Sequence, residues 1–257
     1  MIEGRGISLS LGGTPVLKDV AISLAAGEVV ALCGPNGAGK STLLACLAGE
    51  HQDCSTSVEY SNVPLIGIAP RELARLRVVL EQNPSLTAEF TVSELLELGT
   101  PLELPTADLE RLKVQMIAEF GFSEMRDAFV STLSGGQQHR AHLARILIQL
   151  QANRFLGHTC CLFMDEPTAS LDIRYQINVL QKMRDLAEDG VGVLVVLHDL
   201  NLAAAFSDRI VLMRDGQITH AGTPVDVLRE NVLSDVYETG IFVEHASNGQ
   251  VIIQPRL

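Results

Sequence analysis

A glycine-rich segment near the N-terminus has the residue types needed to bind phosphate groups. It fits the pattern G-x-x-x-x-G-K-[ST] and stands between an apolar, β-branched run and a helical pattern. Glycines let the backbone curl so that successive N–H groups point at phosphate oxygens, and the helix N-terminus adds partial positive charge. Lys40 would neutralise the β- and γ-phosphates of a nucleotide, and the Ser41 hydroxyl would ligate Mg²⁺. The predicted phosphate-binding residues are Gly34, Pro35, Asn36, Gly37, Ala38, Gly39, Lys40, Ser41 and Thr42.

Two carboxylates follow a second apolar run, residues 160–164. Ligands of open α/β sheets sit at the carboxyl ends of the strands, which is where this run would deliver Asp165 and Glu166. Asp165 is the expected outer ligand of the Mg²⁺ held by Ser41. Glu166 is the candidate to polarise an attacking water. Combined with the glycine-rich segment, the pair predicts hydrolysis of a nucleotide phosphate.

Gln82 and His198 follow two other predicted strands, residues 78–81 and 193–197. Both side chains would therefore lie at the same edge of the sheet as Lys40 and Glu166. A lone histidine at a strand end is more often structural, but this placement favours a role beside the γ-phosphate.

Residues 133–137 form a second anion-binding pattern, ahead of a helix that is apolar on one side. Ser134, Gly135, Gly136 and Gln137 combine a hydroxyl and two glycines with a helix N-terminus. Taken alone, the pattern would also suit a helix start capped by serine. Because one nucleotide does not need two such sites, the segment indicates a second nucleotide or a second subunit.

Strands and helices alternate along most of the chain, which predicts an α/β fold with a mostly parallel sheet covered on both faces. Strands are expected at residues 7–11, 16–24, 28–33, 58–61, 78–81, 160–164, 193–197, 210–214 and 217–221, and helices at residues 40–49, 71–76, 92–98, 109–120, 136–149, 174–187 and 200–206.

Residues 86–152 contain no convincing strand and are predicted to form a helical subdomain inserted into the sheet domain. At its start, Thr91 and Glu94 have the spacing of a capping box. The tail from about residue 225 is predicted to form one or two helices and a strand at residues 252–253.

Composition limits the classes of partner. The 257 residues carry a net charge of −12 without a basic block, and aromatic residues make up 4%, so nucleic acid is not expected as a ligand. No apolar stretch approaches the roughly 20 residues of a membrane span, and the N-terminus lacks an export pattern, which predicts a cytosolic location. Five scattered cysteines suit reduced, buried thiols. Cys33 adjoins Gly34, so either its thiol lies near the phosphates and makes the enzyme sensitive to thiol reagents, or it is buried at a strand end.

The order of these motifs, with Pro167 after Glu166 and with Asp172 downstream, resembles the ATP-binding cassette (ABC) ATPases over about residues 1–225. The resemblance implies a P-loop NTPase fold with a RecA-like sheet core, an N-terminal antiparallel β-subdomain and the helical subdomain at about residues 86–152. Residues 226–257 would be a C-terminal extension packed on the same domain.

In that family two cassettes pack head to tail. Each ATP is bound between the phosphate loop of one cassette and the signature segment of the other, which corresponds to residues 133–137 here. The resemblance therefore implies that Ser134 and Gly136 serve the partner's nucleotide and that Asp172 links the two sites. It also implies that Gln82 couples Mg²⁺ and the attacking water to a transmembrane partner.

Residues 69–77, 80–82, 90–92 and 198–203 look like those of importers of metal chelates and are most similar to bacterial haem-import ATPases. This implies an ATPase bound to permease subunits at the cytoplasmic face of the inner membrane, served indirectly by a periplasmic or surface substrate-binding protein. Uptake of ferric siderophore or cobalamin is an alternative, as is an ATPase of iron–sulfur assembly without a permease.

Two positions depart from the family pattern. Leu11 stands where many cassettes have an aromatic residue that stacks on adenine, which predicts weaker binding of the base. His139 follows the signature segment where a second Gln or a Lys is commoner, a change that should leave the anion site intact.

Overall fold

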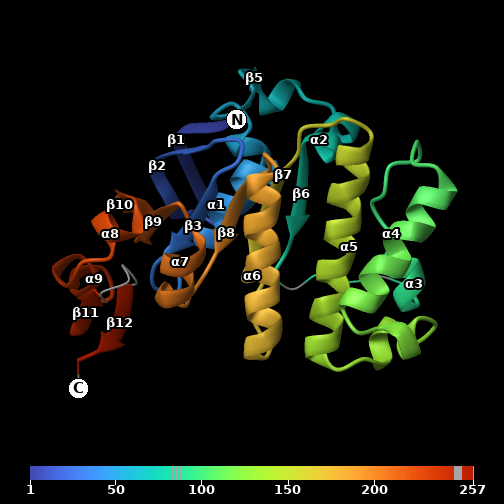
Figure 1. The fold of residues 1–257 in the computed structure, drawn as a ribbon. Coiled ribbons are helices and arrows are strands. Elements are labelled where there is room, and N and C mark those ends of the chain that lie inside the picture. Colours follow the sequence, from blue (N-terminus) through green and yellow to red (C-terminus); the bar gives the residue numbers. More distant parts are fainter. Residues whose placement is uncertain (83, 85, 87, 246–250, 257) are drawn as a thin grey trace.

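The computed structural model describes residues 1–82, 84, 86, 88–245 and 251–256 (Figure 1). Its strands are β1 Ile2–Leu11, β2 Thr14–Leu24, β3 Val29–Cys33, β4 Val58–Tyr60, β5 Val63–Pro64, β6 Arg77–Leu80, β7 Cys161–Asp165, β8 Gly192–Val196, β9 Arg209–Arg214, β10 Gln217–Gly222, β11 Ile241–His245 and β12 Val251–Pro255. Its α-helices are α1 Lys40–Ala48, α2 Pro70–Leu76, α3 Val92–Leu95, α4 Thr106–Glu119, α5 Gly135–Phe155, α6 Ile173–Glu188, α7 Leu200–Phe206, α8 Pro224–Val227 and α9 Glu230–Val236.

The central sheet has six strands in the order β10-β9-β3-β8-β7-β6. All neighbours pair in parallel except β10, which runs antiparallel to β9. Strands β3, β7 and β8 are buried along their whole length, as parallel strands covered on both faces should be. The predicted α/β fold with a mostly parallel sheet is therefore confirmed.

Side chains alternate along β3 and divide the protein into two cores. Val29 and Ala31 face one core, which contains residues of α5, α6, α7 and α9. Val30 and Leu32 face the other, which contains residues of α1 and of the N-terminal strands. Figure 1 shows α5 and α6 along one side of the sheet.

The N-terminal strands form a separate antiparallel sheet in the order β2-β1-β4-β5. Strand β1 begins at Ile2, five residues earlier than predicted, because Gly4 and Gly6 interrupt the alternation of apolar residues that marks a strand. The pairing of β1 with β2 is irregular between Gly4 and Ile7, where this interruption falls. The short β5 carried no such pattern and was not predicted.

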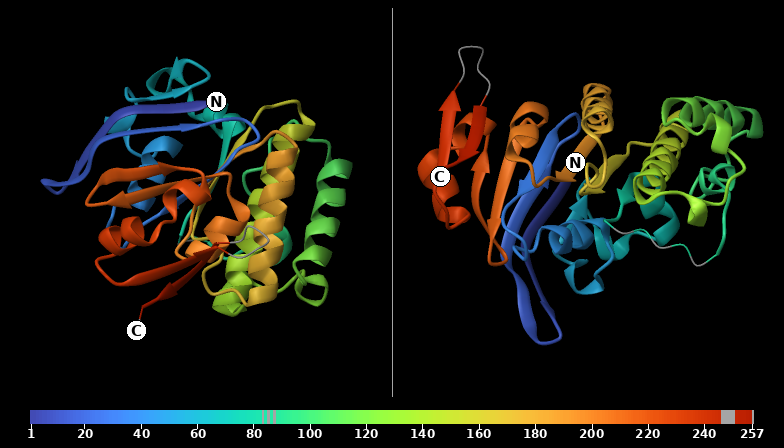
Figure 2. Two further views of the ribbon diagram at one scale, coloured as in Figure 1. Left: turned by 60° about the vertical axis from the view of Figure 1, so that its left-hand side comes forward. Right: turned by 90° about the horizontal axis from the view of Figure 1, so that it is seen from below.

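Between β6 and β7, the described residues hold three α-helices and no strand longer than an isolated bridge. Thr91 and Glu94 form the predicted capping box at the start of α3. Helix α5 runs from the signature segment along the sheet, and Figure 2 shows this helical part at the opposite end of the molecule from the C-terminal strands.

The C-terminal residues form α8, α9 and the hairpin β11–β12. The predicted helices and the strand around residue 252 are present, and β11 is its partner. The side-chain amide of Asn201, on α7, makes two hydrogen bonds to the backbone of Ile253 in β12. Its Oδ1 accepts from the Ile253 N–H at 2.8 Å, and its Nδ2 donates to the Ile253 carbonyl at 3.3 Å. This paired bond fixes the hairpin on the sheet domain.

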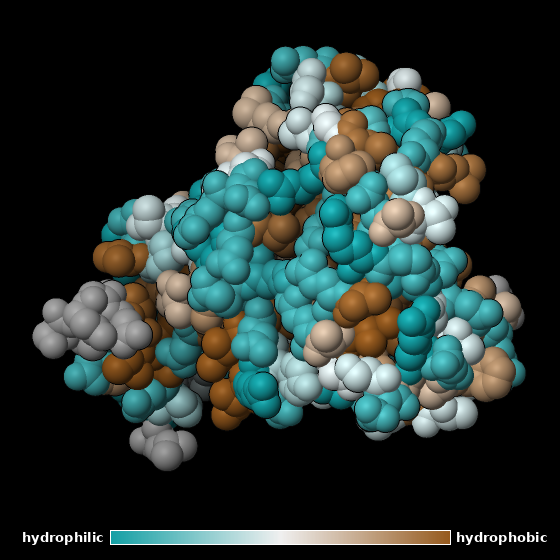
Figure 3. Space-filling view, turned by 45° about the vertical axis from the view of Figure 1, so that its right-hand side comes forward, coloured by the Kyte–Doolittle hydropathy of each residue, from teal (hydrophilic) through white to brown (hydrophobic). Residues whose placement is uncertain are grey.

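Among the described residues, the structure has no helix that is both long and apolar enough to cross a membrane. Figure 3 shows a mainly hydrophilic surface on the side where the helices come forward, with apolar residues in separate patches. All five cysteines are buried and free.

Candidate active site

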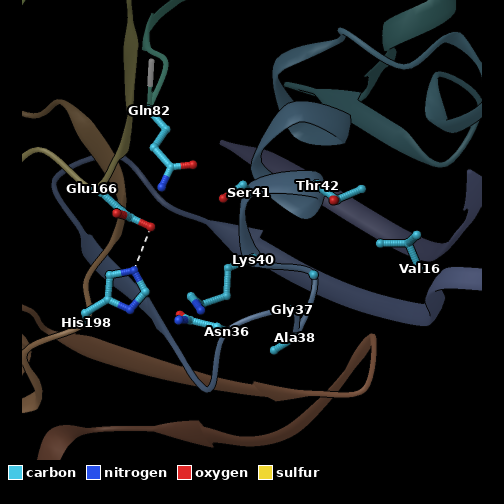
Figure 4. Close-up of a pocket in the computed structure, with 11 residues that line it drawn as sticks. Val16, Asn36, Gly37, Ala38, Lys40, Ser41, Thr42, Gln82, Glu166 and His198 are labelled. Carbon is cyan, nitrogen blue, oxygen red and sulfur yellow. Dashed lines mark hydrogen bonds and ion pairs between the residues drawn. The ribbon is translucent and has the colours of Figure 1, made fainter.

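The carboxyl ends of β3, β6, β7 and β8 meet the start of α1 around a pocket of about 460 Å³. Its walls come from five separate parts of the chain (Figure 4). The lining residues are Val16, Asn36, Gly37, Ala38, Gly39, Lys40, Ser41, Thr42, Gln82, Glu166 and His198.

The glycine-rich segment is the loop between β3 and α1. Gly34 has a φ of +142°, and a Cβ at this position would lie 2.1 Å from the carbonyl oxygen of Met213 on β9. Gly39, with a φ of +97°, is the left-handed residue at the N-terminus of α1. These conformations need glycine, so the loop can wrap tightly between the strand and the helix.

Lys40 lies at the first position of α1 and is 6% exposed. Its Nζ donates to the carbonyls of Gly34 and Pro35, each at 2.9 Å. Burial lowers the pKa of Lys40, while Glu166 and Asp165 are among the groups that oppose this effect. The ammonium group is thus held inside the loop by acceptors that a phosphate could replace.

Ser41 and Asp165 connect α1 to the end of β7. The Ser41 hydroxyl donates to Oδ1 of Asp165 at 3.1 Å. Burial raises the pKa of Asp165, and the hydrogen bond from Ser41 acts in the opposite direction. Hydroxyl and carboxylate oxygens are the ligands that Mg²⁺ prefers, so this pair fits such an ion.

Glu166 and His198 face each other across the pocket (Figure 4). Nε2 of His198 lies 2.6 Å from Oε1 of Glu166. A carboxylate only accepts hydrogen bonds, so Nε2 carries the proton. Glu166 has a φ of +52°, a conformation that is uncommon outside glycine and concentrates at functional sites.

Gln82 comes after β6 and lines the same pocket. Figure 4 shows its side chain extending toward the space between Glu166 and Ser41. The structure thus brings Gln82, Glu166, His198 and residues 36–42 of the phosphate loop together around one pocket, as predicted. Asp165 joins this site through its hydrogen bond to Ser41, and the carbonyls of Gly34 and Pro35 join it through Lys40.

The signature segment and Asp172 are not among the lining residues of this pocket in the part of the chain that the structure describes. Ser134 caps α5 through a capping box with Gln137. Asp172 caps α6, accepting from the Tyr175 N–H at 3.0 Å. Both helix starts are well formed but lie outside this nucleotide pocket.

Cys33 is fully buried, and burial raises the pKa of its thiol to about 12. The alternative of a reactive thiol beside the phosphates is therefore wrong, because β3 holds this side chain inside the core.

Val16 also lines the pocket, and the sequence analysis did not predict it. Val16 lies shortly after the Gly12-Gly13 turn, on the same hairpin as Leu11. The resemblance placed Leu11 beside the adenine base, and this proximity could have identified Val16 as a pocket residue.

A family model described as ABC transporter matches residues 17–169. The chain belongs to the ABC transporter family. It is an ABC-type ATPase, and ATP is the ligand that this assignment supports.

Two curated relatives match nearly the whole chain, and both are called hemin import ATP-binding protein HmuV. The protein from Rhodopseudomonas palustris (strain HaA2) is 38% identical over 256 residues, covering 100% of this chain and 97% of the relative. The protein from Agrobacterium fabrum (strain C58 / ATCC 33970) is 41% identical over 240 residues, covering 93% and 92%.

The fold also matches a solved ATP-binding cassette, described as dimeric, in a post-hydrolysis state and bound to ADP and Pi. The TM-score is 0.73 at 24% identity, with 87% of this chain and 99% of the cassette covered. At this identity the match supports the fold alone.

Proposed function

We propose that this chain is the ATP-hydrolysing subunit of an ABC importer that takes up haem, attached to the cytoplasmic face of the inner membrane. The observation that carries the proposal is the pocket lined by Lys40, Ser41 and the Glu166–His198 pair, with Asp165 hydrogen-bonded to Ser41 behind it. The cargo is argued from the relatives, whose names specify hemin import at 38% and 41% identity.

In this proposal the loop of residues 34–42 binds the phosphates of ATP. Its backbone N–H groups and the N-terminus of α1 supply donors and partial positive charge. The Nζ of Lys40 leaves the carbonyls of Gly34 and Pro35 and contacts the β- and γ-phosphates. The exchange is favourable because a phosphate oxygen is a stronger, charged acceptor than a carbonyl.

Ser41, Gln82 and Asp165 would hold Mg²⁺, which neutralises phosphate charge when bound. Ser41 and Asp165 already share a hydrogen bond at 3.1 Å, so their oxygens are close enough to face one ion. Asp165 is 6% exposed, and a cation beside it would offset the cost of burying its carboxylate.

Glu166 acts as the general base. Its carboxylate accepts a proton from the water that attacks the γ-phosphorus, and the bond from that phosphorus to the bridging oxygen of ADP breaks. His198 donates to Glu166 in the structure and would turn its N–H toward the γ-phosphate when ATP is present. Gln82 would orient the water from the opposite side.

Two copies of the chain would close head to tail around two ATP molecules. Ser134, Gly135, Gly136 and Gln137 of one copy would complete the site of the other, with Asp172 between the two sites. Support comes from their position: these polar helix starts are formed but lie apart from the chain's own nucleotide pocket. Hydrolysis should then be cooperative in ATP.

Opening and closing of this dimer would drive permease subunits bound beside residues 82–98. The helical subdomain at about residues 86–152 would move relative to the rest of the ATPase domain, residues 1–225, while residues 226–257 would stay packed as a C-terminal extension. A periplasmic or surface substrate-binding protein would deliver the cargo to the permease.

The test is affinity purification of the Glu166→Gln chain from its native membranes with Mg·ATP, followed by mass spectrometry and reconstitution of the recovered complex. Recovery of a polytopic permease, and ATP-dependent haem uptake when that permease is reconstituted with the unaltered chain, would support the proposal. Uptake of a siderophore or cobalamin would overturn the cargo. Recovery of assembly proteins without a permease would overturn import itself.

A further inference from the structure

His139 makes a contact that the ATP pocket does not explain. It lies on α5 one turn beyond Ser134, and its ring is half-buried. Its Nε2 is 2.9 Å from the carbonyl oxygen of Pro167, the residue that directly follows Glu166. Helix α5, which begins at the signature segment, is thus hydrogen-bonded to the loop that carries the general base.

The chemistry of this bond fixes its direction. A carbonyl oxygen can only accept, so His139 donates from Nε2 and must carry a proton there. Pro167 is buried and has no N–H of its own. Its carbonyl therefore anchors this point of the loop by accepting from a side chain of another element.

The anchored loop, residues 166–172, has an unusual backbone at two of its residues. Glu166 and Ser170 have φ values of +52° and +58°. Such conformations persist only where the surroundings hold them. Gln176 of α6 contributes by donating to the Thr168 carbonyl at 3.2 Å, and His139 contributes from the side of α5.

The signature segment touches the same loop at a second point. A Cβ at Gly136 would lie 3.0 Å from the Ser170 carbonyl oxygen, so only a small residue allows this approach. The capping box of Ser134 and Gln137 fixes the first turn of α5. A displacement of this turn would therefore move the His139 ring and the Pro167 carbonyl with it.

We propose that His139 is a positioning residue that couples the signature segment to Glu166 of the same chain. This rests on the proposed function, in which the signature segment contacts ATP bound by the partner. When that ATP draws the start of α5 toward it, the His139–Pro167 bond sets the backbone of Glu166 for attack by water. His139 does not line the chain's own ATP pocket and acts through the loop.

Three substitutions separate this role from simple packing. His139→Gln keeps an N–H donor at similar reach, His139→Phe keeps a planar ring without a donor, and His139→Ala removes both. We expect Ala and Phe to lower kcat roughly tenfold, the amount that one lost hydrogen bond can produce. They should also lower the Hill coefficient for ATP toward 1, while Gln restores both values. The Kd for ATP should stay within about twofold, because the pocket itself is intact.

The assays are steady-state ATP hydrolysis over a range of ATP concentrations and calorimetric titration of ATP. His220→Ala is the control, since it removes an exposed imidazole on β10 far from this contact. Urea unfolding of each variant establishes that it is folded. In ¹⁵N-histidine spectra, neutral His139 should be the Nε2–H tautomer, and the His139→Gln spectrum assigns its signal.

The outcomes distinguish this proposal from the proposed function. If the Glu166→Gln chain forms ATP-dependent dimers, but His139→Ala and His139→Phe keep the parental kcat and Hill coefficient, the coupling role is refuted. Equal losses in Gln, Phe and Ala would also refute it, because the donor would then be irrelevant. If no dimer forms with ATP, the head-to-tail arrangement fails instead, and the tautomer of His139 still tests the bond to Pro167.

Discussion

Replacement of Lys40 by methionine should weaken ATP binding without unfolding the protein. Nζ makes two hydrogen bonds of 2.9 Å to loop carbonyls, so at least two of its three N–H donors are directed into the loop where phosphates would bind. Two charge-assisted bonds, at about 1.5 kcal/mol each, amount to about 3 kcal/mol. That loss raises the Kd for ATP roughly 150-fold.

Stability should change far less than affinity. Methionine retains the unbranched stem, and burial already lowers the pKa of Lys40, so the folded state gains little from its charge. We expect the free energy of unfolding to stay within about 1 kcal/mol of the parent because water in the open pocket can serve the two carbonyls. Lys182→Met, at a surface ion pair with Glu119, is the matched control and should bind ATP normally.

Calorimetric titration of ATP without Mg²⁺, so that no ATP is hydrolysed during the measurement, gives the Kd of each folded variant. A Kd for Lys40→Met within threefold of the parent would refute the assignment of Nζ to the phosphates. A similar loss in Lys182→Met would show that the effect is nonspecific charge removal.

Three other predictions use separate parts of the structure. Burial lowers the pKa of His142 to about 4. Between pH 6.5 and 4 the unfolded chain therefore binds a proton that the folded chain does not. The free energy of unfolding should fall by up to about 3 kcal/mol as the pH drops through this range. Urea unfolding at several pH values should show a shallower dependence in His142→Gln, and an unchanged slope would contradict the assignment. Gly34→Ala should lower the free energy of unfolding by at least about 2 kcal/mol, because its Cβ would lie 2.1 Å from the Met213 carbonyl oxygen. Gly37→Ala is the control and should cost about 1 kcal/mol, because a Cβ there would have no atom within 4 Å. Equal urea midpoints for the two variants would refute the packing argument. Leu11→Tyr should tighten ATP about fivefold by stacking on adenine but leave inorganic triphosphate unaffected, and an equal gain for both ligands in calorimetry would exclude base stacking.

The sequence predicted the sheet core well because its buried parallel strands are continuous apolar runs. The ends of β3, β7 and β8 followed from where these runs stop, and the polar residues just beyond them form the pocket. Strand β1 was the weak point, since Gly4 and Gly6 hide its alternation.

Contacts between distant segments had no such signal. The spacing of Ser41 and Asp165 along the chain says nothing of their hydrogen bond, which the parallel packing of β3, β8 and β7 creates. The bond of His139 to Pro167 is similar: the sequence marked His139 as unusual, but only the packing of α5 against the loop after β7 shows its acceptor. The burial of Cys33 likewise depends on which face of β3 carries it.

The central claim, that Glu166 is the base of a composite ATP site, is tested most directly by Glu166→Gln. The account predicts that ATP hydrolysis falls at least about 100-fold, the range of a lost general base, while the Kd for ATP stays within threefold. Light scattering with Mg·ATP should show a stable dimer of this variant, and Glu188→Gln at the end of α6 should behave as the parent. Hydrolysis by Glu166→Gln at the parental rate would contradict the claim.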